Sequence, residues 1–224
     1  MLAQVTRLQE ALAFLGNALS AGDAASIKAL REKKYGPETI TSLQNILDPY
    51  CLAMVEINPE ARVKVTRGAA KAVLVKGGWS SFLVKVNNDA GINAALEVTS
   101  PNAAPDVNGS SFEARVRPEN VLTRGQVENR FMEVSMYKNR PLQARLSGLT
   151  LEYAVVQLYS REAGLREVNL GFNIGQGTQD IGFRNAISIL FNSRPAIKVN
   201  LHIKDLRVIN EWTNIGFLSI GRYC

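Results

Sequence analysis

Histidine is almost absent from this sequence: His202 is the single one among 224 residues. Zinc and two-metal hydrolase sites usually draw on several histidines together with Asp or Glu, so the chain cannot build a multi-histidine metal site of its own. A Ser-His-Asp triad would need His202 beside a serine. The alternation of apolar and polar residues over 199–204 predicts instead that His202 lies on the solvent-facing side of a strand. The sequence therefore predicts no catalytic residue, no metal site and no cofactor.

Cysteine is scarce as well, with only Cys51 and Cys224. Cys51 opens an apolar run, which indicates a small buried residue, and a terminal residue such as Cys224 is a poor disulfide partner because chain ends usually fray. The two residues do not identify a redox compartment. No stretch approaches the run of about 20 apolar residues that a membrane-spanning helix needs, and residues 1–7 lack the features of a signal peptide.

Positive charge exceeds negative charge, with a formal net charge of +6, but the excess is not clustered. The arginines between Arg115 and Arg145 are separated by acidic and apolar residues. A nucleic-acid interface needs basic residues gathered on one face. We therefore expect no nucleic-acid partner.

Residues 1–50 have the period of helices. Gly22 is expected to end a first helix, Asp23 to cap a second, and Pro37 to open a third. In the first helix, leucines recur at spacings of four, three and four, which places them on one stripe: Leu8, Leu12, Leu15 and Leu19.

From Cys51 onward the pattern becomes one of short apolar or alternating runs separated by turn residues, without intervening helices. Such a pattern is typical of an antiparallel sandwich rather than of βαβ units. The predicted fold class is mainly β: an antiparallel β-sandwich over residues 51–205, preceded by a short α-helical N-terminal segment over 1–50. Residues 206–224 lack a regular period and are expected to form a disordered or truncated tail.

Two features invite a ligand-binding interpretation. The glycine-rich segment 171–180 does not match a dinucleotide fingerprint, because Asp180 stands where a glycine or alanine is required, so a turn or bulge between strands is the simpler interpretation. Asp180 with Arg184 could form a calcium turn or a ligand-facing loop, or simply an Asx-type turn. Trp79, at the entry of a strand, could stack on a sugar or a partner, or be a core or edge aromatic. With Asn102, from the Pro/Asn/Gly loop 100–111, these residues are the candidate binding residues.

Several segments together resemble the N-terminal, non-catalytic region of bacterial CehA/McbA-family metallohydrolases of the PHP superfamily. The similarity covers about residues 25–205. In that family the metal ligands belong to a separate PHP domain that this chain lacks, so the resemblance implies an accessory region, and it implies export to the periplasm or the outside of the cell. The segments that carry it are 57–65, 78–86, 88–91, 100–105, 171–180 and 189–195.

Three functions remain open from the sequence. The first is a non-catalytic accessory or interaction module of a metallohydrolase-like protein. The second is a stand-alone module that binds carbohydrate or another ligand. The third, an enzyme with a pair of carboxylates, has no pair of residues to support it. The expected partner is a protein or a carbohydrate, and the sequence does not indicate an oligomeric state.

Overall fold

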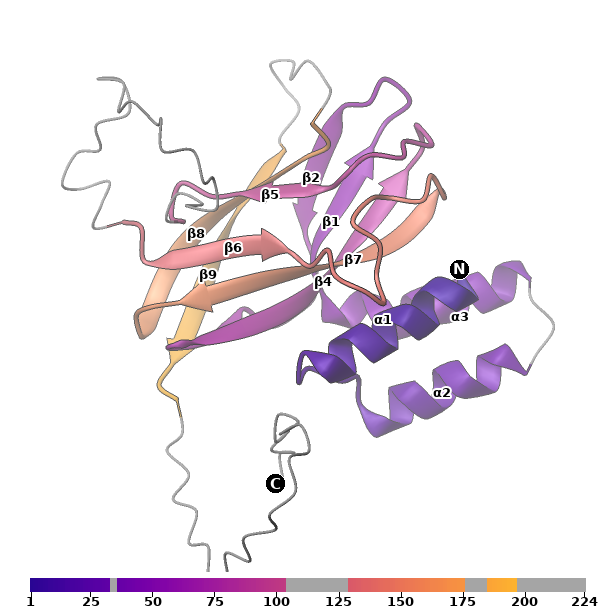
Figure 1. The fold of residues 1–224 in the computed structure, drawn as a ribbon, viewed down its shortest axis with the longest axis horizontal. Helices are drawn as coiled ribbons and strands as arrows, with labels where there is room; N and C mark the ends of the chain where they lie inside the picture. The colour runs from indigo at the N-terminus through magenta and orange to yellow at the C-terminus, as the bar shows by residue number, and fades with distance from the viewer. Residues whose placement is uncertain (33–35, 104–128, 176–184, 197–224) are drawn as a thin grey trace, which may run out of the picture.

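The computed structural model describes residues 1–32, 36–103, 129–175 and 185–196 and is mainly β, with helices ahead of the strands (Figure 1). This confirms that the chain is mainly β and that a helical segment precedes the strands. Segment 206–224, His202, Asp180 and Arg184 lie outside the described residues. The helical elements are α1 (Leu2–Phe14), α2 (Ala21–Arg31), α3 (Pro37–Leu47) and the 3-10 turn η1 (Asp48–Tyr50). The described strands are β1 (Cys51–Ile57), β2 (Val63–Arg67), β3 (Val73–Val75), β4 (Gly78–Asn88), β5 (Glu97–Thr99), β6 (Met132–Met136), β7 (Leu151–Ser160), β8 (Gly164–Asn173) and β9 (Ala186–Arg194).

The first helix ends earlier than its leucine stripe suggested. Gly16, and not Gly22, terminates α1: its backbone has a φ of 70°, a left-handed conformation that glycine adopts without strain. The amide of Gly16 donates to the carbonyl of Ala13 and that of Asn17 to the carbonyl of Leu12. This pair of bonds is a Schellman motif, which satisfies carbonyls that the helix end leaves free.

The second helix begins with a different cap from the expected one. Ser20 is the N-cap of α2, and its Oγ accepts a hydrogen bond from the amide of Asp23 at 3.1 Å. Asp23 therefore lies inside the first turn, where its charge is favourable near the positive end of the helix dipole. Pro37 opens α3 as predicted. Within the described residues no helix is long and apolar enough to cross a membrane.

The strands form two sheets with mixed pairing. Sheet A has the order β2-β1-β4-β7-β6 and sheet B the order β3-β9-β8-β5. Five of the seven strand pairs within the described residues are antiparallel, but β1 with β4 and β3 with β9 are parallel. The antiparallel arrangement expected from the sequence is therefore confirmed only in part. The chain leaves sheet A after β2, passes through β3 in sheet B and returns in β4. The alternation of apolar and polar side chains does not encode such a crossover.

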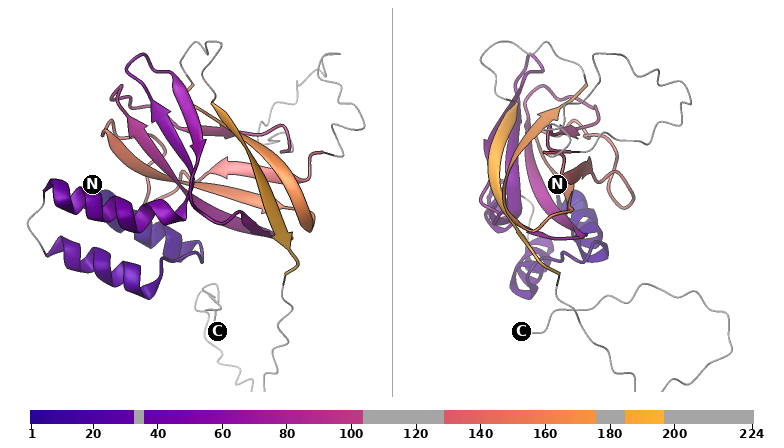
Figure 2. Two further views of the ribbon diagram at one scale, coloured as in Figure 1. Left: turned by 180° about the vertical axis from the view of Figure 1, so that it is seen from behind. Right: turned by 90° about the vertical axis from the view of Figure 1, so that its left-hand side faces the viewer.

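Each face of sheet A packs against another layer, one of them along only part of its length. One face shares a core with sheet B, in which the Phe82 ring lies 6.2 Å from that of Phe191 and the hydroxyl of Ser193 donates to that of Ser160 at 3.0 Å. The other face packs against the helices, which gather at one end of the sheets (Figures 1 and 2). This second core contains the sheet residues Cys51, Leu83, Tyr153 and Val155, Leu19 from the connection between α1 and α2, and the helical residues Val5, Leu8, Ala11, Leu12, Ile27, Leu43 and Leu47.

Candidate binding surface at the uncovered end of sheet A

The site arises from the alternation of side chains along β4 and β7. Because Leu83 and Val155 belong to the core beneath the helices, residues two and four positions away on the same strands point toward the same face. On β4 these are Ser81 and Trp79, and on β7 Gln157 and Tyr159. The helices cover only one end of this face, so it changes along the strands from buried and apolar to aromatic and polar.

Register brings two of these side chains into one row with a residue of a third strand. Trp79 of β4 pairs with Tyr159 of β7, and Tyr159 pairs in turn with Glu133 of β6. We call Trp79, Tyr159 and Glu133 the aromatic row. The Trp79 and Tyr159 rings have centroids 5.5 Å apart at 52°, and Glu133 is held by Arg161 at 2.7 Å. Directly opposed residues on one face have neighbouring side chains, so the row is a continuous surface.

Trp79 is the exposed member of this row. Its exposed fraction is 50%, although tryptophan usually buries most of its large ring. Tyr159 supports the ring from one side and limits the positions it can take. An indole that is both exposed and held in place can stack on a flat apolar partner at a low cost in side-chain entropy.

A hollow of about 510 Å³ adjoins Trp79, between the end of α1 and strands β3 and β4. The amide side chain of Asn17 reaches across it and donates to the carbonyl of Ser81. Hydrogen-bonding groups around an apolar ring are the combination by which ligand sites fix orientation. The polar residues that line the hollow are Asn17, Tyr50, Lys71, Ser80, Ser81 and Arg194.

The structure separates the candidate binding residues. Trp79 lies in the hollow, but Asn102 has a structural role: its Oδ1 accepts from the amide of Asn169 at 3.0 Å, and its backbone carbonyl accepts from Met132. Asn102 thus ties its loop to β8 and β6. Asn102 does not line the hollow beside Trp79, and Asp180 and Arg184 lie outside the described residues.

Sequence reasoning missed Tyr159 and Asn17. Tyr159 lies within the predicted β region 51–205, and its polar-aromatic alternation with Gln157 is a usable signal for an exposed face. Nothing in the sequence indicated that this strand pairs with the one carrying Trp79. Asn17 reaches the site only because α1 ends at Gly16 and turns toward β4.

A second polar cluster lies beneath the helices. Lys85, whose side chain is 9% exposed, places its Nζ 2.7 Å from Oδ2 of Asp48, while the Tyr153 hydroxyl donates to Oδ1 of Asp48 at 2.9 Å. Cys51 lies beside them, and burial, together with the negative charge of Asp48, raises the pKa of its thiol to about 12. Burial and the hydrogen bond to Asp48 raise the pKa of the Tyr153 hydroxyl as well.

These pKa shifts bear on the chemistry of the cluster. A thiol is a nucleophile only as the thiolate, and near neutral pH Cys51 remains protonated. The cluster therefore fastens η1 to β4 and β7 rather than activating a nucleophile. Among the described residues no group of three or more His, Cys, Asp or Glu side chains could hold a metal ion.

No family model matches the chain, and the search of curated proteins finds no match. The resemblance to the CehA/McbA family therefore stays a prediction.

Proposed function

We propose that this chain is a non-catalytic binding module that recognises carbohydrate through the aromatic row and the hollow beside it. The observation that carries the proposal is Trp79: it is half exposed, is supported by Tyr159, and stands at the rim of a hollow lined by polar groups. A sugar ring offers an apolar face to stack on an indole and hydroxyls at its edges for hydrogen bonds, which matches this arrangement.

We further infer that sheets A and B are the two layers of a β-sandwich, because both contribute residues to one core. In this architecture the helices form a third layer that covers part of sheet A and defines the border of the site. The proposal includes the accessory role implied by the resemblance: attached to a larger hydrolase, such a module would hold the enzyme near its substrate. The accessory role requires no chemistry from this chain.

The proposal can be tested on the purified full chain. A glycan array identifies candidate sugars, and isothermal titration calorimetry measures the dissociation constant of the best of them. Truncation of a central binding aromatic costs about 2 kcal/mol, so Trp79→Ala should weaken binding about 30-fold, and Trp79→Phe should weaken it less.

Leu190→Ala is a matched control, because Leu190 is 61% exposed on sheet B. Its affinity should equal that of the unaltered chain. A sugar that binds Trp79→Ala as tightly as the unaltered chain would refute the assignment of the site. If no sugar on the array bound and a protein partner shielded Trp79 instead, the proposal that the ligand is a carbohydrate would be refuted.

A further inference from the structure

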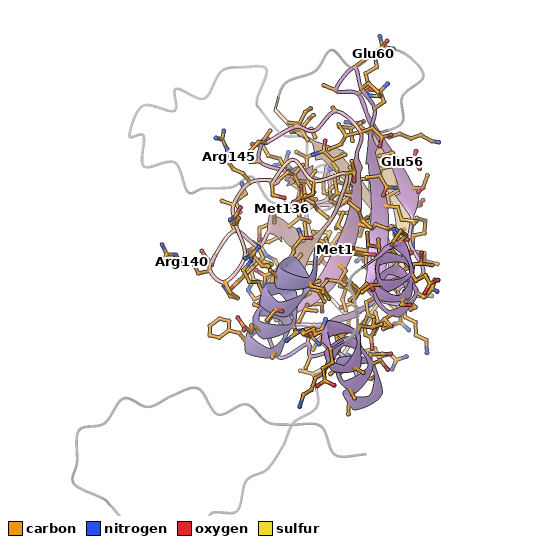
Figure 3. All side chains as sticks on the ribbon, turned by 90° about the vertical axis from the view of Figure 1, so that its right-hand side faces the viewer. Met1, Glu56, Glu60, Met136, Arg140 and Arg145 are labelled. Atoms are coloured by element: carbon orange, nitrogen blue, oxygen red, sulfur yellow. The ribbon has the colours of Figure 1, made fainter. Side chains whose placement is uncertain are left out.

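The face of the molecule beside the start of α1 carries positive charge without partners. Arg7 projects from α1, while Lys138, Arg140 and Arg145 belong to the loop 137–149 that connects β6 to β7. We call these four residues the basic group. In Figure 3 Arg140 and Arg145 extend outward on the same side of the molecule, with Met136 behind them. No side chain of the basic group has an ion-pair or hydrogen-bond partner among the described residues.

Two adjoining hollows lie within the basic group. The inner one has a volume of about 380 Å³ and is lined by Arg7, Lys138 and Arg145. The outer one, lined by Arg7, Lys138 and Arg140, shares two of these cations with it. A volume of about 380 Å³ falls within the range of small-molecule sites, roughly 300–1,000 Å³. The hollows therefore form one basic cleft between α1 and the loop.

The floor of the inner hollow offsets only part of this charge, because it supplies one carboxylate against the three cations of the lining. Glu152 is its one carboxylate, is 3% exposed, and accepts hydrogen bonds from the amide of Ser147 at 2.9 Å and from Nε2 of Gln4 at 3.3 Å. With both oxygens engaged in this way, Glu152 anchors the loop, and it makes no ion pair with the basic group. The guanidinium Nε of Arg7 and the Oε1 of Gln4 are buried and have no hydrogen-bond partner among the described residues. Such unpaired atoms are rare in native structures and call for an explanation, one of which is a bound water or ion.

The first turn of α1 adds to the positive potential. Ala3 and Gln4 line the inner hollow, no side chain caps the helix, and its first turn has no acidic residue. The free amides of an uncapped helix start attract anions. The apolar part of the lining includes Met136, Leu142 and Leu146.

We propose that this cleft binds a small organic anion, which places a carboxylate or phosphate group among Arg7, Lys138 and Arg145 and an apolar portion against Met136 and Leu142. The acid group supplies a negative partner for the cations of the basic group. The methionine and leucine side chains exclude water from the rest of the ligand. This site is separate from the aromatic row and does not depend on the proposed sugar-binding function.

The test uses octanoate and octyl phosphate as anionic probes, octanamide as their neutral counterpart, and inorganic phosphate as an anion without an apolar part. Titrations of the full ¹⁵N-labelled chain followed by NMR should show saturable binding of both anionic probes, with shifts confined to the first two turns of α1, the loop 137–149 and the start of β7, which line the cleft. Octanamide and inorganic phosphate should bind at least about tenfold more weakly, because each lacks one of the two interactions.

Arg145→Gln tests the charge without risk to the core, because Arg145 is exposed. It should weaken octanoate binding about tenfold, the usual effect of losing one charge-assisted hydrogen bond. Lys28→Gln, at an exposed position of α2, removes the same charge elsewhere and should leave the affinity unchanged. Equal binding of octanamide and octanoate, equal effects of the two substitutions, or shifts outside the cleft would each overturn the proposal. Preferential binding of an acidic peptide over every octyl probe would also overturn it in favour of a protein partner.

Discussion

Replacing Asp48 with asparagine tests whether the cluster beneath the helices fastens them to sheet A. The substitution removes the negative charge that faces Lys85 and keeps an oxygen to accept the Tyr153 hydroxyl. Lys85 is then left charged at a position where its side chain is only 9% exposed. Removing one partner of a fully buried pair costs about 3–5 kcal/mol, but the Asp48 side chain is 33% exposed, so part of this cost is screened by water. We expect a loss of about 2–3 kcal/mol in the free energy of unfolding.

The assay is urea unfolding followed by circular dichroism and tryptophan fluorescence. Asp48→Asn should lower the transition midpoint without changing the dependence on urea, and should lower Tm by about 4–12 °C, since about 1 kcal/mol corresponds to 2–4 °C in a chain of this size. Lys85→Met should cost less, because the carboxylate that it leaves behind is better hydrated than the ammonium. The double variant should recover most of the loss of Asp48→Asn.

Glu56→Gln is the control, because it breaks an ion pair with Lys64 whose two side chains are about half exposed. Exposed pairs contribute about 0–1 kcal/mol, so this variant should differ little from the unaltered chain. If Asp48→Asn proved as mild as Glu56→Gln, the cluster would not fasten the helices. If the double variant were less stable than either single one, the argument from an unpaired buried charge would be wrong.

Three further outcomes follow from single side chains. Since burial raises the pKa of the Cys51 thiol to about 12, a chain whose terminal cysteine is replaced by serine should not react with Ellman's reagent at about pH 8 until urea unfolds it; a rapid reaction of the folded chain would contradict this. Hydrogen bonds from Tyr50 and then Ser20 hold the pKa of Asp23 below its ordinary value, so they stabilise the fold above the unfolded-state pKa and lose this effect as pH falls through the folded-state pKa. Tyr50→Phe should accordingly lower Tm near neutral pH and lower it less at about pH 2, and a difference that is independent of pH would argue against this linkage. A Cβ on Gly68 would lie 2.1 Å from the carbonyl oxygen of Cys51, so Gly68→Ala should cost at least about 2 kcal/mol by urea unfolding, and a stability equal to that of the unaltered chain would show that the backbone yields there.

Helix and strand content could be read from periodicity alone, because it depends on local alternation. The stripe through Leu8 and Leu12 is buried as predicted, and Cys51 begins the first strand and is buried. The ends of α1 and α2 were placed wrongly because residues 15–23 contain two glycines and several residues that can cap a helix. Which of these residues ends or begins a helix depends on where the chain must turn to bring α2 and Tyr50 together. Ser20 contacts both, because its Oγ caps α2 and its amide donates to the Tyr50 hydroxyl at 3.1 Å.

Strand pairing and the site depend on contacts between segments distant in sequence. Composition and local pattern were enough to place Trp79 at the start of a strand and to show that the chain lacks the histidines for a multi-histidine metal site. The pairing of Trp79 with Tyr159, the parallel course of β1 and β4, and the end of sheet A that the helices leave uncovered became known from the three-dimensional fold. Alternation gives the face of each side chain along its own strand, whereas neighbours across strands follow from the packing of whole layers, which no short segment encodes.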